Sequence, residues 1–239
     1  MRKLDQNTFN TLESSPDPSR LLWNTESRRN EGKTVLFDVN IVHRKGPEGR
    51  EGDFVELDFA RGGVTIIPYF TGSDGVARFV MERQFRHGTE SVTLEFPAGL
   101  VEKGESASDA AARELWEETG LRAGRITFLG SVCQNSAYMR CPVGFCLAEN
   151  MSVETDLKDR SLDQNEQIDI LTVPVSYVLE NIGEGELTNG AALLAVPFFL
   201  REMRKRGLTF CLPSVFSQCD RALSRSLQGP LRPARSLRR

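Results

Sequence analysis

The chain has 239 residues, a formal net charge of −3 and 39% hydrophobic residues, which suffices for one sizeable core with extensions. Its five cysteines form no CxxC pair and it has only two histidines, so the composition argues against a zinc site and a disulfide scaffold. No apolar run approaches the roughly 18 residues of a membrane span, and the N-terminus lacks the apolar core of a signal peptide. We therefore expect a cytoplasmic protein without a membrane partner.

The first part of the chain predicts a polar extension followed by strands. Residues 1–31 are mostly polar, and Trp23 is the one large side chain there that could pack against a core. We therefore expect an N-terminal extension over this range. Apolar patterns separated by turn-prone stretches then predict strands over residues 34–43, 54–59, 63–70 and 77–84.

An acidic helix is predicted over residues 107–119. Ser106 followed by Asp109 is typical of an N-terminal cap, and Gly120 supplies the stop. Glu117 and Glu118 follow Glu114 by three and four residues, so all three carboxylates project from one side of this helix.

This carboxylate cluster points to a hard divalent cation. Like charges at such spacings destabilise a helix by about 0.2–0.5 kcal/mol per pair, and a bound cation would remove the repulsion. Oxygen ligands with no His or Cys nearby suit magnesium or manganese rather than zinc. The alternative is a solvated acidic face in which Arg113 and Glu117 form an ordinary ion pair.

The remaining pattern completes an α+β order. Strands are predicted near residues 126–133, 143–147 and 168–173, followed by a helix over 176–182. A last helix is predicted from after Asn189 towards Arg206, with Pro197 as a possible kink and Gly207 as its stop.

We expect the catalytic domain to span residues 32–208 and a basic tail to span residues 209–239. Between Arg221 and Arg239 there are six arginines and no acidic residue. Such a segment could bind nucleic acid or anionic lipid. Because no aromatic residue is interleaved and no folded basic motif surrounds it, we expect a disordered, solvated tail that does not bind nucleic acid.

The residues around the acidic helix resemble the signature of the Nudix hydrolases. Gly99, Glu105 and the run Arg113-Glu114-Leu115-Trp116-Glu117-Glu118-Thr119-Gly120-Leu121 match G-x5-E-x7-R-E-Leu-x-E-E-x-G-Leu at every fixed position. The resemblance implies an α+β fold, an α/β/α sandwich with a mixed sheet, and a pyrophosphatase that uses Mg²⁺ or Mn²⁺. It makes Glu114 and Glu118 catalytic metal ligands, with Glu117 and the Ala98 carbonyl as further ligands. Glu105 and Arg113 would be structural, with Arg113 orienting a carboxylate.

The flanking segments resemble ADP-ribose and related nucleotide-sugar pyrophosphatases. They are Arg83-Gln84-Phe85-Arg86 and Glu95-Phe96-Pro97-Ala98-Gly99. By this resemblance Arg86 would pair with a substrate phosphate and Arg83 would assist; the alternative is two surface cations at a strand end. Glu95 would bind metal or a ribose hydroxyl, or simply lie on a solvated strand face.

Two further site residues come from loops. The resemblance places a water-activating or metal-binding glutamate on a late loop, for which Glu166 is the candidate. ADP-ribose pyrophosphatases commonly have a Ser-Pro-Gly segment downstream of the acidic helix. This chain has Gln134-Asn135-Ser136-Ala137-Tyr138-Met139 there, which weakens the assignment to ADP-ribose specifically. Within that segment Tyr138 could stack on a base or sugar, or be an ordinary packed aromatic.

The expected function is therefore Mg-dependent hydrolysis of the diphosphate linkage of ADP-ribose or another nucleoside diphosphate sugar, giving a nucleoside monophosphate and a sugar phosphate. GDP-mannose and nucleoside triphosphates are alternative substrates. A third hypothesis is a catalytically silent nucleotide-sugar sensor, although such proteins often lose glutamates of the Nudix signature, which are all present here. The resemblance also implies a homodimer in which N-terminal strands cross between subunits.

Overall fold

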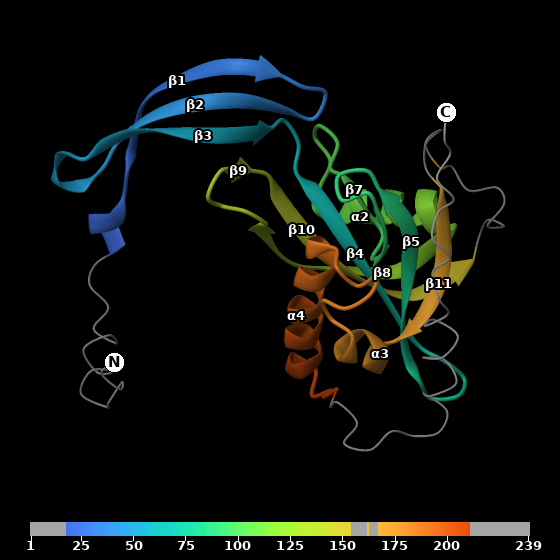
Figure 1. Ribbon diagram of the computed structural model, residues 1–239. Coiled ribbons are helices and arrows are strands. Elements are labelled where there is room, and N and C mark those ends of the chain that lie inside the picture. The colour runs from blue at the N-terminus through green and yellow to red at the C-terminus, as the bar shows by residue number, and fades with distance from the viewer. Residues whose placement is uncertain (1–17, 154–161, 163–166, 211–239) are drawn as a thin grey trace, which may run out of the picture. The chain divides into compact units, whose positions relative to one another are not determined.

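The computed structural model describes residues 18–153, 162 and 167–210. The chain divides into two compact units (Figure 1). The first unit comprises Met1–Arg61 and Cys133–Cys141, and the second comprises Gly62–Val132 and Pro142–Arg239.

The first unit is a sheet in the order β1-β2-β3-β9. Its described elements are η1 (Pro18–Leu21), β1 (Asn24–Lys33), β2 (Phe37–Lys45), η2 (Pro47–Gly49), β3 (Glu51–Phe59) and β9 (Met139–Arg140). The strands β1, β2 and β3 pair antiparallel, and β9 adds parallel to β3. Most of β1 lies within the expected polar extension and was not predicted as a strand. Its side chains are almost all exposed, so the conformation follows from backbone pairing with β2 rather than from an apolar pattern.

The second unit is built on a mixed sheet in the order β11-β5-β4-β10-β8, with β6 paired to β5 and β7 paired to β4. Its elements are β4 (Gly63–Thr71), β5 (Ala77–Arg86), β6 (Ser91–Glu95), β7 (Ala98–Leu100), α2 (Ala107–Thr119), β8 (Leu121–Cys133), β10 (Pro142–Val153), β11 (Ile168–Pro174), α3 (Val175–Glu180) and α4 (Gly190–Lys205). The pairing of β4 with β10 is parallel, whereas β4 with β5 and β5 with β11 are antiparallel. The predicted strands in this unit exist, and β6 and β7 are additional.

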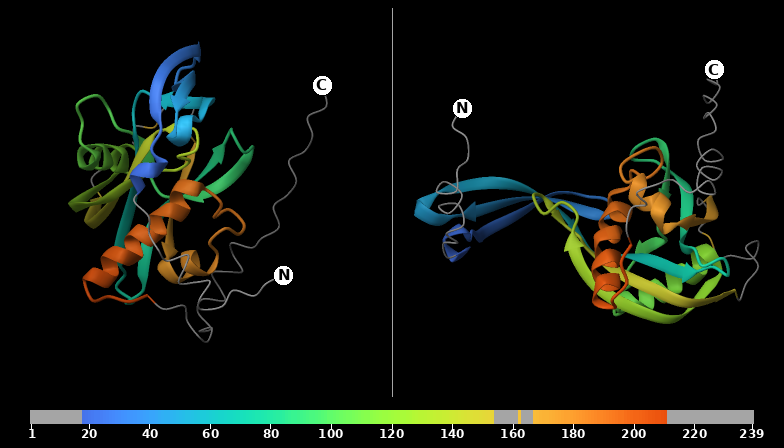
Figure 2. Two further views of the ribbon diagram at one scale, coloured as in Figure 1. Left: turned by 90° about the vertical axis from the view of Figure 1, so that its left-hand side faces the viewer. Right: turned by 90° about the horizontal axis from the view of Figure 1, so that it is seen from below.

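Helices pack on both faces of this sheet (Figure 2). One core cluster joins Ala111 and Leu115 of α2 to Ile66 of β4. On the other face Phe199 of α4 contacts Phe79 of β5, with ring centroids 4.8 Å apart. The second unit therefore has helix, sheet and helix layers, as the resemblance to Nudix hydrolases implies.

The ends of both long helices follow their sequence signals. The Ser106 side chain accepts a hydrogen bond from the Asp109 amide, and Gly120 adopts a left-handed conformation with φ of 69°. The Asn189 side chain caps α4, and Pro197 lies inside that helix. Among the described residues, no helix combines the length and apolarity needed to cross a membrane.

The described chain continues past the expected domain end at residue 208. The Phe210 ring lies 5.3 Å from that of Phe199 and 6.1 Å from that of Tyr69. The aromatic core of the second unit therefore includes a residue that the sequence assigns to the tail. Residues 211–239 lie outside the described residues, so a disordered tail stays a prediction.

Candidate active site

Two carboxylates of α2 lie against the backbone of β7. The amide of Ala98 donates a hydrogen bond of 3.0 Å to Oε2 of Glu118, whose side chain is buried. A Cβ atom at Gly99 would lie 2.0 Å from Cδ of Glu114, so glycine is needed for this close approach. The structure thus brings together three residues of the predicted metal site, Ala98, Glu114 and Glu118.

Arg113 organises the acidic face of the helix. Its guanidinium donates to Glu114 Oε1 at 2.8 Å, to Glu117 Oε2 at 3.0 Å and to the carbonyl of Leu100 at 2.9 Å. It also binds both oxygens of Glu105 at 3.1 Å. Hydrogen bonding to Arg113 lowers the pKa of the Glu105 carboxyl. These contacts confirm that Arg113 orients carboxylates, as the sequence predicts, and show that it does so for three of them.

The donor set suits a hard cation. Glu114, Glu117 and Glu118 supply carboxylate oxygens on one side of α2. Because Gly99 has no side chain, the backbone of β7 comes close to these carboxylates and could add a carbonyl ligand. Within the described ranges, no three acidic, His or Cys side chains already stand in a metal-binding arrangement. In the arrangement seen, Arg113 holds oxygens of both Glu114 and Glu117. The residues fit a hard divalent cation in their chemistry, and their roles as ligands stay a prediction.

Arg86 lies beside this cluster and is held by Glu95. Its Nε and Nη2 donate to the two oxygens of Glu95 at 2.8 and 2.6 Å. This bonding raises the pKa of Arg86, burial opposes the increase, and the charges of Glu95, Glu118 and Glu82 add to it. Glu95 is 2% exposed, which excludes the solvated strand face that the sequence left open.

Arg83 lies on the other face of β5. Along this strand Arg83 and Arg86 are three positions apart, so their side chains leave opposite faces of the sheet. The Nε of Arg83 donates to Glu186 at 2.8 Å. The structure therefore does not place Arg83 with Arg86.

Glu82 is a buried acidic residue that the sequence reasoning did not single out. It is fully buried on β5, pairs in register with Glu95 on β6, and shares its face with Arg86. The available signal was its place directly after the apolar residues Phe79-Val80-Met81 within a predicted strand. Charged residues are almost never fully buried without a partner, so a buried glutamate indicates a functional or paired site.

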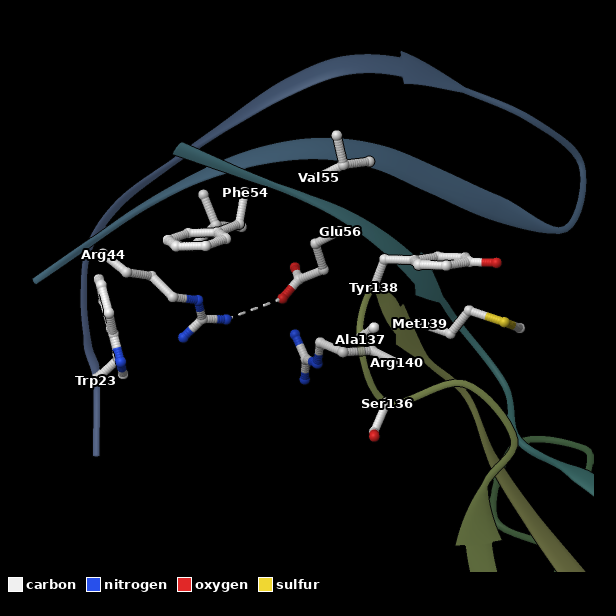
Figure 3. Close-up of a pocket in the computed structure, with 11 residues that line it drawn as sticks. Trp23, Arg44, Phe54, Val55, Glu56, Ser136, Ala137, Tyr138, Met139 and Arg140 are labelled. Carbon is white, nitrogen blue, oxygen red and sulfur yellow. Dashed lines mark ion pairs between the residues drawn. The ribbon is translucent and has the colours of Figure 1, made fainter. Parts of the chain in front are cut away.

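Tyr138 belongs to the first unit. It lines a cavity of about 430 Å³ together with Trp23, Arg44, Phe54, Glu56, Arg140 and neighbours (Figure 3). Arg44 pairs with Glu56 at 3.6 Å, and Arg28 pairs with the same carboxylate at 2.9 Å. These three charged residues come from three adjacent strands and tie the sheet together. Tyr138 is 45% exposed, and its role in substrate binding stays a prediction.

Glu166 lies outside the described residues, so its expected role stays a prediction as well.

Comparison with known families matches the part of the chain that contains the acidic helix. Residues 61–168 match the family model described as NUDIX domain. The chain carries a Nudix domain. This match contains the acidic helix, β7 and Arg86, and it confirms the Nudix resemblance predicted from the sequence.

Similar proteins act on ADP compounds. The chain is 31% identical over 121 residues to the ADP-ribose pyrophosphatase of Bacillus subtilis, covering 51% of this chain and 64% of that protein. It is 33% identical over 138 residues to the ADP-sugar pyrophosphatase of Mus musculus, covering 56% of this chain and 62% of that protein. The chain thus spans less than two thirds of the length of either relative.

A solved structure supports the fold. The crystal structure of an ADP compounds hydrolase matches with a TM-score of 0.67 and 22% identity, covering 77% of this chain and 96% of that one. The α+β Nudix fold predicted from the sequence is therefore confirmed.

Proposed function

We propose that this Nudix protein hydrolyses the diphosphate linkage of ADP-ribose or a related nucleoside diphosphate sugar, releasing a nucleoside monophosphate and a sugar phosphate. The observation that carries the proposal is the approach of Glu114 and Glu118 to the Ala98–Leu100 backbone, with Arg86 electrostatically coupled to Glu118. Similarity to pyrophosphatases of ADP-ribose and ADP-sugars supports this substrate class.

The chemistry needs charge neutralisation. The anionic oxygens of a diphosphate repel nucleophiles, and a divalent cation supplies neutralisation and orients water for in-line attack. Glu114 and Glu118, with Glu117 and the carbonyl of Ala98, would hold Mg²⁺ or Mn²⁺. Arg113 keeps two of these carboxylates oriented through its fork of donors.

The other proposed roles concern substrate and water. Arg86 donates to a phosphate oxygen, for which a planar guanidinium is well suited. Tyr138 stacks on the base or sugar, and Glu166 activates the attacking water. Replacing Glu166 by Gln should then lower kcat with little change in KM, whereas Tyr138→Ala should raise KM.

A substrate panel tests the proposal. ADP-ribose, ADP-glucose, GDP-mannose, UDP-glucose and nucleoside triphosphates are compared with Mg²⁺, with Mn²⁺ and with chelator, and products are identified by chromatography. We expect the highest kcat/KM for a diphosphate sugar, with cleavage between its phosphates. Faster hydrolysis of every triphosphate would overturn the substrate class. Binding of a nucleotide sugar without turnover would favour the silent sensor.

We also propose a homodimer formed through the first unit. Val35, Leu36, Phe54 and Val55 are exposed apolar side chains there, and burying such residues against a second copy would stabilise the unit. Light scattering after size exclusion should give the dimer mass for the wild type and a smaller mass for Val55→Asp. A monomeric wild type at micromolar concentration would refute this arrangement.

A further inference from the structure

The guanidinium of Arg86 donates to the buried carboxylate of Glu95 on one side, and N–H donors on its other side remain for a ligand. Arginine has five N–H donors, and Glu95 uses those on Nε and Nη2 at 2.8 and 2.6 Å. The bond to Glu95 does not use the Nη1 donors. The Arg86 side chain is 40% exposed whereas that of Glu95 is 3% exposed, so the carboxylate lies on the inner side of the pair.

Glu95 is itself held from within the sheet. The hydroxyl of Thr93 donates to Oε1 of Glu95, the oxygen that also accepts from Nε of Arg86. Thr93 is 4% exposed, and it lies two positions before Glu95, on the same face of β6. The three side chains therefore form a chain of hydrogen bonds that runs from buried Thr93 and Glu95 to the partly exposed guanidinium of Arg86.

We propose that Thr93 and Glu95 are positioning residues that fix the Arg86 guanidinium so that its remaining donors meet a phosphate oxygen of the substrate. In this role Glu95 acts through Arg86 instead of binding metal or a ribose hydroxyl. The proposal rests on the proposed function, which makes Arg86 a phosphate ligand.

Electrostatics explain why such a restraint is needed. Arg86 is attracted by Glu118 and Glu82 as well as by Glu95. Without the bidentate bond to Glu95, the guanidinium would move towards Glu118, the carboxylate that Ala98 holds beside β7. The restraint also fixes the rotamer of Arg86 before substrate binds, which reduces the ordering cost of binding.

The same contacts disfavour a direct metal role for Glu95. Both of its oxygens already accept charge-assisted bonds from Arg86, and one also accepts from Thr93. A cation approaching these oxygens would have to displace the guanidinium, which would separate the buried Glu95 carboxylate from its counter-charge.

The test compares Glu95→Gln, Thr93→Val, Thr93→Ser and Arg86→Ala with the wild type. Glu149→Gln is the matched control, because Glu149 forms a similar two-oxygen pair with Arg206 in the same unit. Affinity for inorganic diphosphate is measured by calorimetry, which needs no turnover. The values of kcat, KM and the metal concentration for half-maximal rate are measured with the best substrate of the panel.

We expect Glu95→Gln to weaken diphosphate binding and raise KM by roughly tenfold, the loss typical of one charge-assisted hydrogen bond. Thr93→Val should weaken diphosphate binding by a smaller factor. Thr93→Ser, which keeps the hydroxyl, should retain most of the wild-type affinity. The metal requirement should not change. Adding Glu95→Gln to Arg86→Ala should cause no further loss, because both changes remove the same phosphate contact.

Additive losses in the double variant, or a raised metal requirement in Glu95→Gln, would overturn the proposal and make Glu95 a direct ligand. Unchanged diphosphate affinity in all variants would overturn it as well. If the wild type hydrolyses no diphosphate sugar, the proposed function fails, but the calorimetric comparison still decides the positioning role.

Discussion

Replacing Gly99 by alanine would place a methyl carbon inside the space of the Glu114 carboxylate. The new Cβ would lie 2.0 Å from Cδ and Oε1 and 2.4 Å from Oε2, whereas ordinary contact begins at 3.4 Å. The carboxylate must therefore withdraw by about 1.4 Å, the difference between 3.4 and 2.0 Å. Since misplacing a reacting group by about 1 Å can cost about 10²-fold in rate, we expect Gly99→Ala to lower kcat by roughly that factor.

The fold should survive this change. Gly99 is not among the glycines with positive φ, so alanine is compatible with its backbone. Glu114 is a flexible side chain that can rotate away, at the cost of its 2.8 Å bond to Arg113. We expect the melting temperature to stay within a few degrees of the wild type while steady-state hydrolysis falls.

Two comparisons make the assay specific. Gly63→Ala is the control, because its Cβ would meet the Gly99 carbonyl at an ordinary 3.5 Å and should leave kcat unchanged. Glu114→Asp shortens the side chain by one methylene, so Gly99→Ala should cost less in the Glu114→Asp background than in the wild type. Wild-type kcat in Gly99→Ala, with the protein folded, would refute the idea that the Glu114 position matters.

Three further changes have defined outcomes. Glu118→Gln should lower kcat by at least about 10²-fold while circular dichroism stays unchanged, since it removes a metal-binding charge but keeps an acceptor for the Ala98 amide; near-wild-type rates at saturating Mg²⁺ would count against Glu118 as a ligand. Glu105→Gln should destabilise the protein at neutral pH, because the hydrogen bond from Arg113 lowers the pKa of Glu105 from its ordinary value of 4.5. A carboxyl group whose pKa is lower in the folded protein than in the unfolded chain stabilises the fold at every pH above the ordinary pKa. Denaturation at several pH values should show this difference shrinking as the pH falls through the lowered pKa. Phe199→Ala should cost about 3–5 kcal/mol in urea unfolding, because the ring is fully buried among aromatic residues; a loss below about 1 kcal/mol would contradict its place in the core.

The acidic helix could be predicted because its signals are local. The cap at Ser106, the stop at Gly120 and the spacing of the carboxylates all lie within 15 consecutive residues. The strand β1 could not be predicted in this way, since its sequence has no apolar alternation and its order comes from pairing with β2.

The partners of the site residues depend on contacts between distant segments. The bond from Ala98 to Glu118 spans 20 residues, and the pair of Arg83 with Glu186 spans 103. Strand pairing sets Glu82 opposite Glu95, a register that periodicity within either strand does not contain. The opposite orientation of Arg83 and Arg86 was available from strand alternation, but the strand predicted over residues 77–84 ended before Arg86.

The two-sided use of β5 makes this strand sensitive to changes in length. Its even-numbered positions carry Glu82 and Arg86 beside Glu95, and its odd-numbered positions carry Arg83 towards Glu186. Deleting or inserting one residue within the strand would exchange the two sets of side chains between faces. Arg86 would then leave Glu95, and buried Glu95 would lose its counter-charge. Natural length variation around this site should therefore be confined to the turn at residues 87–90.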